Sequence, residues 1–385
     1  MHILSKPPIP SSFKNITIGP MSKGKYAIVF KTDRNDVEIP HFRRKGNRLI
    51  DISNIEFDAT LGQGSPDIIS EPTIFAGPCF QHFGHFVAEC IHRIYARRYF
   101  PELKGAKIAF LVREGESTEL NSWLECILKI LGVDMEDVIF IDRPKLFSQL
   151  YIPYPGRIMS GPTLIKDYAN IMPYNFSEID GRHLQGKMIY VSRSKHLYSG
   201  GYIGESFVEK YLSSFGFETI YPESMSTDKF VGLLRSSRCA VFSEGSSIHN
   251  LELCGKTSLA AFVIGRRTGT KERFEYILED HCSTYDFYEE TRYLGSMEWD
   301  PRRDKPMTSR GLATTNIANL LKKILVFFEL PFQQPDLEDL EDLERWILAD
   351  IGRYLLDSRA TRSRTTSNEQ LGKLLTEMRA NYKLC

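Results

Sequence analysis

The stretch RCAVFSEGSSIHNLELCGKTSLAAFVIG, residues 238–265, places two short apolar runs on either side of a polar loop and a helix-like segment. The runs 238–243 and 258–265 are rich in Ala, Val and Phe and are bounded by Ser and Gly, which favours strands. Segment 246–255 between them is expected to be a helix. A strand, a helix and a strand joined by short loops predict a parallel pair of strands.

The same alternation extends upstream. Strands are expected at 188–194 and 217–223, and helices at 205–216 and 226–237, the first ending on Gly216 as a C-cap. Four strands alternating with three helices predict a parallel, doubly wound sheet, in which ligands bind beyond the carboxyl ends of the strands. Those ends carry Arg193, Ser194, Glu223, Ser224, residues 244–247, Arg266 and Arg267.

The first half of the chain predicts a separate α/β domain, and the C-terminus predicts helices. Residues 1–72 have a β-rich pattern. The expected strands are 25–32, 48–53, 107–112, 138–142 and 149–154, and the expected helices are 121–131, 316–330, 336–356 and 368–385. We therefore divide the chain into domains 1–183 and 184–333 and a helical extension 334–385.

A second informative stretch is FAGPCFQHFGHFVAECIHRI, residues 75–94. If it is helical from Gly84, one face carries His85, Glu89, His92 and Arg93, and the opposite face carries Val87, Ile91, Ile94 and Tyr95. This favours an acid/base site facing a cleft. Two other interpretations stay open: metal ligation by His82, His85 and Glu89, and polar residues that merely line a cleft between domains.

The loop at 243–247 favours a phosphate. Gly245 permits close approach of the backbone, Ser246 and Ser247 supply hydroxyls, and the following helix start supplies N–H groups. Arg193, at the end of another strand of the same sheet, can fork onto a phosphate. The loop has no Walker, dinucleotide or nucleophile-elbow pattern. A plain serine N-cap and a surface arginine are the alternatives.

Composition narrows the class of protein. The 385 residues are 42% hydrophobic and 25% charged with zero net charge, so no overall field favours nucleic acid or an anionic membrane. No apolar run is long enough for a transmembrane helix, and the N-terminus does not resemble a signal peptide. The seven cysteines lack CxxC spacing, which is typical of reduced thiols in the cytoplasm.

The order of these motifs resembles glycosyltransferase family 61, including its bacterial polysaccharide-biosynthesis branch. The family commonly has an N-x-x-H-aromatic-x-x-E-x-x-x-R segment, and here His85, Phe86, Glu89 and Arg93 match in register, with His82 at the usual Asn. The later GxHGAxLxN segment corresponds to residues 244–250, with Glu244 in place of His. His249 is not expected to substitute for that histidine from its place on the helix. The resemblance covers about residues 75–265.

The resemblance implies a GT-B-like fold of two Rossmann-like domains facing a cleft, with the C-terminal helices added. It implies an inverting glycosyltransferase that needs no metal or cofactor and moves a sugar from a nucleotide-sugar donor to an oligosaccharide or glycolipid acceptor, in capsule or other cell-surface polysaccharide synthesis. Such an enzyme would work in the cytoplasm, with peripheral association at the inner face of the membrane as an option.

The implied roles are as follows. Glu89 is the first candidate for the base and His85 the second, whereas His82 and Arg93 are assigned to the acceptor. The donor diphosphate is assigned to Arg193, Ser194, Glu244, Gly245, Ser246, Ser247 and Asn250. Two alternatives stay open: a pyruvyl-type or other group transferase on the same fold, and a catalytically silent nucleotide- or sugar-binding protein, which the Glu244 departure favours.

Overall fold

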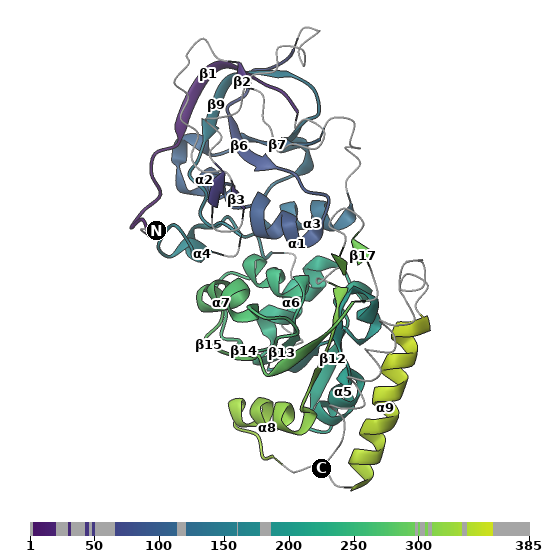
Figure 1. Ribbon diagram of the computed structural model, residues 1–385. Helices are drawn as coiled ribbons and strands as arrows, with labels where there is room; N and C mark the ends of the chain where they lie inside the picture. The colour runs from purple at the N-terminus through teal and green to yellow at the C-terminus, as the bar shows by residue number, and fades with distance from the viewer. Residues whose placement is uncertain are drawn as a thin grey trace. The chain divides into compact units, whose positions relative to one another are not determined.

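The computed structural model describes residues 3–20, 30–31, 43–45, 48–50, 66–113, 121–159, 161–177, 186–296, 299–300, 305–306, 310–332 and 337–356. The chain forms two compact units of mixed α/β structure (Figure 1). The first unit comprises residues 1–180, 226–232 and 249–256, and the second comprises the rest. Two helical elements therefore contribute residues to both units.

The first unit is built on a mixed sheet. Its strand order is β2-β1-β9-β6-β7-β8, with β5 paired to β9. Strands β6, β7 and β8 are parallel, whereas β1 runs antiparallel to β9. The bounds are β1 Ser11–Ile18, β2 Phe30–Lys31, β5 Asp67–Ile69, β6 Thr73–Pro78, β7 Lys107–Leu111, β8 Val138–Ile141 and β9 Lys145–Ile152; a separate hairpin joins β3 Arg43–Lys45 to β4 Arg48–Ile50.

Short helical elements accompany this sheet. They are α1 Phe83–His85, the π-helix η3 Phe86–Cys90, α2 Ala96–Tyr99, η4 Pro101–Leu103, α3 Ser122–Ile130, η5 Met135–Asp137 and α4 Tyr168–Ile171. Helix α3 buries Leu124, Ile127 and Leu128, the apolar stripe expected of an amphipathic helix. Phe75, Leu111 and Phe147 belong to one buried apolar cluster of the sheet.

The second unit contains the parallel sheet that the sequence predicts. Its strand order is β12-β10-β13-β14-β15, and every neighbouring pair is parallel. The bounds are β10 Met188–Val191, β12 Phe217–Ile220, β13 Cys239–Ser243, β14 Ala260–Ile264 and β15 Thr284–Tyr288. From β10 the chain continues to β12, which lies on one side of β10, and then crosses to β13, which lies on the other side of β10. The gap between the ends of β10 and β13 is thus a topological switch point, where ligands bind in such sheets.

Helices connect and cover these strands. They are η7 Ser194–Ser199, α5 Glu205–Ser213, η8 Pro222–Ser224, α6 Thr227–Ser236, η9 Ser246–Leu253, α7 Thr270–His281, α8 Ile317–Phe327 and α9 Leu337–Leu356. The segment expected as a helix at 246–255 is the 3-10 helix η9. Further short strands are β11 Gly201–Tyr202, β16 Thr291–Gly295, β17 Trp299–Asp300, β18 Lys305–Pro306 and β19 Leu312–Thr315.

The acidic helix α9 packs within the second unit, beside α5 (Figure 1). Its Leu343 and Ile347 enter the apolar core. Asp350 is completely buried, and its carboxylate accepts hydrogen bonds from the Gly204 N–H (2.9 Å) and the Ser206 hydroxyl (2.8 Å) at the start of α5. The carboxylate therefore caps a helix that lies far away in the sequence.

Most expected elements between residues 107 and 265 are confirmed to within a few residues, as is the helix at 316–330. The strand expected at 25–32 is described only at Phe30–Lys31, and the one at 48–53 only at Arg48–Ile50. The helix expected at 368–385 lies outside the described residues. The structure adds a fifth strand, β15, to the four parallel strands that the sequence predicts, and helix α7 connects β14 to it.

Candidate active site

The histidine-rich segment forms a helix that is interrupted by a π-turn. Helix α1 continues directly into η3, and after Cys90 the chain leaves the helix. His85 Nδ1 lies 2.7 Å from Glu89 Oε1, so the expected pair on one face is present. The His85 side chain is 44% exposed, whereas that of Glu89 is 4% exposed. Only the imidazole is therefore well placed to meet a substrate.

His92 and Arg93 do not share that exposed face. Both are 2% exposed. His92 Nδ1 lies 3.0 Å from the Tyr168 hydroxyl, and Arg93 Nε donates to the Pro153 carbonyl at 2.9 Å. Because the i→i+5 bonds of the π-turn wind the chain more slowly than an α-helix, the expected α-helical phase is lost after Cys90. This burial argues against a contact between Arg93 and an acceptor.

His82 lies within electrostatic reach of two other imidazoles of the first unit, those of His85 and His249. His82 is exposed, and its ring meets that of His85 edge-on, with the centroids 5.1 Å apart. Partial burial, together with the nearby rings of His85 and His249, lowers the pKa of His82. The sequence pattern predicts no role for His249.

In the second unit, Arg193 and Gly245 come together at the switch point. The Arg193 N–H donates to Glu205 Oε1 (2.8 Å), and its Nε donates to the Gly200 carbonyl (3.1 Å). A Cβ atom on Gly245 would lie 2.4 Å from Arg193 Nη1. The glycine therefore permits the close approach of this guanidinium to the loop. Phosphate binding at this loop stays a prediction.

Glu244 accepts hydrogen bonds from several residues of the loop after β14 and of α7. It is completely buried, with Oε2 accepting from the Arg266 N–H (2.9 Å) and the Thr270 hydroxyl (2.7 Å). Its other oxygen accepts from Arg267 Nε (2.8 Å) and Arg273 Nη1 (3.2 Å). The charges of Arg267 and Arg266 hold the pKa of Glu244 below its usual range, although burial alone would raise it. This burial favours a positioning role for Glu244 over the contact with the donor that the sequence predicts.

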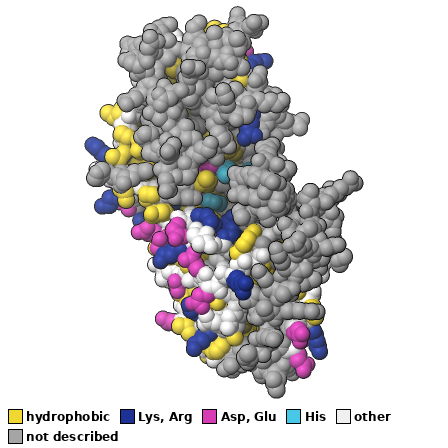
Figure 2. Space-filling model, viewed as in Figure 1, with side chains coloured by type: hydrophobic (Ala, Val, Ile, Leu, Met, Phe, Trp, Pro, Cys, Tyr) yellow, Lys and Arg dark blue, Asp and Glu magenta, His cyan; other side chains and the backbone are white. Residues whose placement is uncertain are grey.

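The arginines gathered by Glu244 are the main feature that the sequence analysis did not assign. Arg267 is 24% and Arg273 35% exposed, whereas Arg266 is buried. Burial and then the neighbouring charges of Arg267, Arg193 and Arg273 lower the pKa of Arg266 to about 9. Four guanidiniums near a single ionised carboxylate favour an anionic ligand. Figure 2 shows Lys and Arg side chains (dark blue) at several places on the viewed face, interspersed with Asp and Glu.

The other residues assigned to the donor differ in exposure. Ser246 is exposed and Ser247 half-buried at the first turn of η9. Ser194 and Asn250 are each 3% exposed. The Ser194 N–H donates to the Ser192 hydroxyl at 2.9 Å. Ser246 and Ser247 thus stay the better candidates for a ligand contact.

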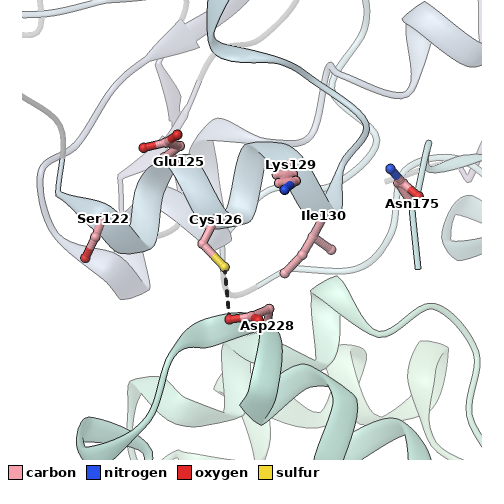
Figure 3. Close-up of a pocket in the computed structure, with 7 residues that line it drawn as sticks. All are labelled: Ser122, Glu125, Cys126, Lys129, Ile130, Asn175 and Asp228. Carbon is pink, nitrogen blue, oxygen red and sulfur yellow. Dashed lines mark hydrogen bonds between the residues drawn. The ribbon is translucent and has the colours of Figure 1, made fainter. Parts of the chain in front are cut away.

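A separate cavity of about 290 Å³ lies beside α3 in the first unit (Figure 3). Its lining is Ser122, Glu125, Cys126, Lys129, Ile130, Asn175 and Asp228. Cys126 Sγ lies 3.6 Å from Asp228 Oδ1, and burial and then this carboxylate raise the pKa of the thiol to about 11. The thiol is therefore protonated near neutral pH and is a poor nucleophile. In the described part of the chain, no group of three or more His, Cys, Asp or Glu side chains is arranged to hold a metal ion.

Residues 83–260 match the Glycosyltransferase 61 family model. The match runs from α1 to the start of β14 and thus includes His85, Glu89, Arg193 and the 244–247 loop. It supports a glycosyltransferase and the resemblance found in the sequence. A comparison with curated proteins gives no match.

Among solved structures, the chain is similar to TibC, an iron-containing dodecameric glycosyltransferase from enterotoxigenic E. coli H10407. The identity is 11% and the TM-score 0.25, over 51% of this chain and 59% of TibC. A second match is to the dodecameric iron-containing heptosyltransferase TibC in complex with ADP-D-β-D-heptose, at 11% identity and a TM-score of 0.29, over 99% of this chain and 95% of that one.

Across the described ranges, no helix combines the length and the apolar character needed to cross a bilayer.

Proposed function

We propose that the protein is an inverting, metal-independent glycosyltransferase with a GT-B arrangement, in which different Rossmann-like domains bind donor and acceptor. It would transfer a sugar from a nucleotide-sugar donor to a glycan acceptor during synthesis of a capsule or another cell-surface polysaccharide in the cytoplasm. The observation that carries the proposal is the arginine cluster at the β10/β13 switch point, in a chain whose residues 83–260 match the Glycosyltransferase 61 family.

The donor diphosphate is assigned to Arg193, Arg267, Arg273 and the loop at Gly245. Guanidiniums bind phosphate oxygens through paired, charge-assisted hydrogen bonds. Because Glu244 already holds Arg267 and Arg273 in place before a ligand binds, these side chains lose little conformational entropy on binding. The same charges stabilise the diphosphate as it leaves, so that no metal ion is required for that purpose.

The base is assigned to His85, with Glu89 holding its ring. The sequence placed Glu89 first, but the 44% and 4% exposures of the two side chains favour the reverse order. In the reaction, the acceptor oxygen attacks the anomeric carbon, and its proton passes to His85. The bond between the anomeric carbon and the diphosphate breaks, and its electron pair stays on the diphosphate oxygen. Glu89 fixes the tautomer and direction of the ring. The exposed His82 is assigned to acceptor binding.

The test is turnover of a panel of nucleotide sugars by the purified protein, followed by mass spectrometry of the products. His85→Gln should lower kcat by about 10²–10⁴, the usual contribution of a positioned base, with little change in donor affinity. The matched control is Glu102→Gln, an exposed residue of the same unit, which should act like wild type. Exhaustive chelation should leave turnover unchanged.

Three outcomes would contradict parts of this proposal. Near-normal turnover in His85→Gln together with inactive Glu89→Gln would restore Glu89 as the base. Activity lost on chelation and restored by one metal would revive ligation by His82, His85 and Glu89. Nucleotide binding without hydrolysis or transfer would favour the silent binding protein, and transfer of a pyruvyl group would favour the other transferase.

A further inference from the structure

A buried carboxyl group, that of Glu205, contacts the turn that carries Arg193 in the second unit. Glu205 is the first residue of α5 and is completely buried. Its Oε1 accepts hydrogen bonds from the Arg193 N–H (2.8 Å), the Tyr190 hydroxyl (3.0 Å) and the Ser192 hydroxyl (3.2 Å). Three donors from β10 and the turn after it therefore converge on one oxygen atom. Glu205 has no part in the function proposed above.

The contacts of Arg193 hold both its main chain and its side chain. Glu205 holds the N–H, whereas Nε donates to the Gly200 carbonyl at 3.1 Å and Nη2 donates to the Ser199 carbonyl at 3.3 Å. The guanidinium therefore already has a fixed position beside Gly245 before a ligand binds. Such preorganisation lowers the entropy that the side chain loses on binding an anion.

The second oxygen of Glu205, Oε2, is buried and makes no hydrogen bond to the described residues. A negative charge there has no donor to compensate for its lost hydration. Burial, together with the nearby charge of Glu209, raises the pKa of Glu205 to about 7, although the hydrogen bond from the Arg193 N–H opposes this. A proton on Oε2 leaves the three hydrogen bonds to Oε1 in place, so the carboxyl can hold Arg193 in either charge state.

The charge of Glu205 and that of a bound diphosphate would act on the same guanidinium. Burial lowers the pKa of Arg193, and the charge of Glu205 opposes that decrease, so the two groups interact. A diphosphate on Arg193 would add negative charge close to Glu205, and a like charge disfavours the ionised form of a carboxyl. Binding near neutral pH, where Glu205 is partly ionised, should therefore favour its protonated form.

We propose that Glu205 is a positioning residue of the donor site, which holds the Arg193 turn through Oε1 and takes up a proton when the diphosphate binds. The inference rests on the function proposed above and adds a residue to its donor site. Glu205 acts through Arg193 and does not touch the ligand. The proton comes from solvent and returns to it when the diphosphate leaves, and no bond of the nucleotide or the sugar changes in this step.

Calorimetric titration with UDP-glucose, GDP-mannose and ADP-glucose at pH 5.5, 7 and 8.5 tests the proposal. Two buffers of different ionisation enthalpy at pH 7 give the number of protons taken up. Both phosphates of a nucleotide sugar are esterified, so the ligand itself exchanges no proton near neutral pH. If the proton and the ligand are coupled about tenfold, Glu205 contributes an uptake of about 0.4 proton at pH 7 and makes binding about five- to tenfold tighter at pH 5.5 than at pH 8.5.

The variant Glu205→Gln isolates the effect of the proton. Its amide oxygen can take the place of Oε1, and its NH₂ group that of Oε2, where no described donor competes with it. Because the amide is neutral at every pH, the variant should match wild type at pH 5.5 and should bind about five- to tenfold more tightly than wild type at pH 8.5. A merely structural role predicts no such gain.

The variant Glu205→Leu tests the hold on Arg193. It is neutral like Glu205→Gln but offers no acceptor to the Arg193 N–H, so it should bind about threefold or more weakly than Glu205→Gln at every pH. Melting curves show that each variant is folded at the temperature of the titration. If Glu205→Leu does not fold, the comparison of wild type with Glu205→Gln still decides the proposal.

The groups around the carboxyl define the controls. In the described part of the chain they include Tyr190, Tyr202, Tyr221, Glu209 and Arg193, with Arg266 beyond Arg193. Burial raises the pKa of the three tyrosines, that of Tyr221 to about 12, so they stay neutral up to pH 8.5. Groups elsewhere titrate in wild type and variant alike, so only the difference reports on Glu205. The matched control, Glu218→Gln at an exposed position of β12, should follow wild type at each pH.

Three outcomes would overturn the proposal. The same proton uptake and the same pH dependence of affinity in wild type and Glu205→Gln would show that the proton is not on Glu205, while leaving the donor site in place. Equal affinities of folded Glu205→Gln and Glu205→Leu would show that Oε1 does not hold Arg193 for binding. If none of the three nucleotide sugars binds wild type, the proposed donor site falls, and the role of Glu205 falls with it.

Discussion

Replacing Glu244 by Gln tests whether this residue organises the arginine loop or touches the donor. The change keeps the size of the side chain but removes its charge. In the structure, Oε1 accepts from Arg267 and Arg273, and Oε2 accepts from the Arg266 N–H and the Thr270 hydroxyl. An amide nitrogen at either position is itself a donor, so it would face donors where an acceptor is required.

The expected cost follows from these contacts. Breaking a buried ion pair by removing one partner typically costs about 3–5 kcal/mol, because the remaining charges lose their partner. For a unit of roughly 150–250 residues, each kcal/mol corresponds to about 2–4 °C, so the melting temperature should fall by about 6–20 °C. Nucleoside diphosphate should also bind more weakly, because Arg267 and Arg273 are no longer held in place.

Thermal unfolding followed by circular dichroism, with and without nucleoside diphosphate, measures both effects. The matched control is Glu218→Gln, because Glu218 is 52% exposed and pairs with Lys187 at 2.6 Å. An exposed pair of this kind contributes only about 0.2–1 kcal/mol. If Glu244→Gln melts like wild type and only nucleotide binding is lost, Glu244 contacts the donor directly and the organising role is wrong.

Two further predictions concern the second unit. Burial raises the pKa of Glu205 to about 7, so its contribution to stability is fully present below the ordinary pKa of about 4.5 and is lost as pH rises toward 7. Urea unfolding between pH 4.5 and 8 should therefore show that the free energy of unfolding falls by about 2–4 kcal/mol in wild type but not in Glu205→Gln. The same dependence on pH in the variant would refute this. Asp350→Asn should lower the free energy of unfolding by about 1–3 kcal/mol, because the amide keeps only one of the two oxygens that accept hydrogen bonds at the start of α5. Glu341→Gln, 76% exposed on the same helix, should stay within about 0.5 kcal/mol, and equal values for the two variants would contradict the capping role.

Local pattern was sufficient for four of the five strands in the parallel sheet of the second unit. The strands at 188–194, 217–223, 238–243 and 258–265 are short β-branched and aromatic runs bounded by Gly, Ser or polar residues, and the structure confirms each of them. The close approach at Gly245 was also predictable, because a glycine between a strand and a helix start has few other purposes. These features depend on residues adjacent in the chain, which is the information that a sequence pattern contains.

The helical phase of the His85 segment was only partly predictable. An α-helix from Gly84 correctly pairs His85 with Glu89, since they are four residues apart. It fails for His92 and Arg93, which are buried, because the π-turn at 86–90 and the end of the helix change the direction of later side chains. No local signal in the sequence marks such a turn, since it is stabilised by packing around it.

What the amino-acid sequence by itself determined was therefore the order of most strands and helices, the close approach at Gly245 and the first His–Glu pair. Only the tertiary structure decided that Glu244 collects Arg266, Arg267 and Arg273, and that Glu252 lies beside His92 and Arg157. The physical reason is that the charge state and the role of a buried carboxylate depend on which partners compensate for its lost hydration. Those partners come from distant parts of the chain and meet only when the sheets and helices have packed.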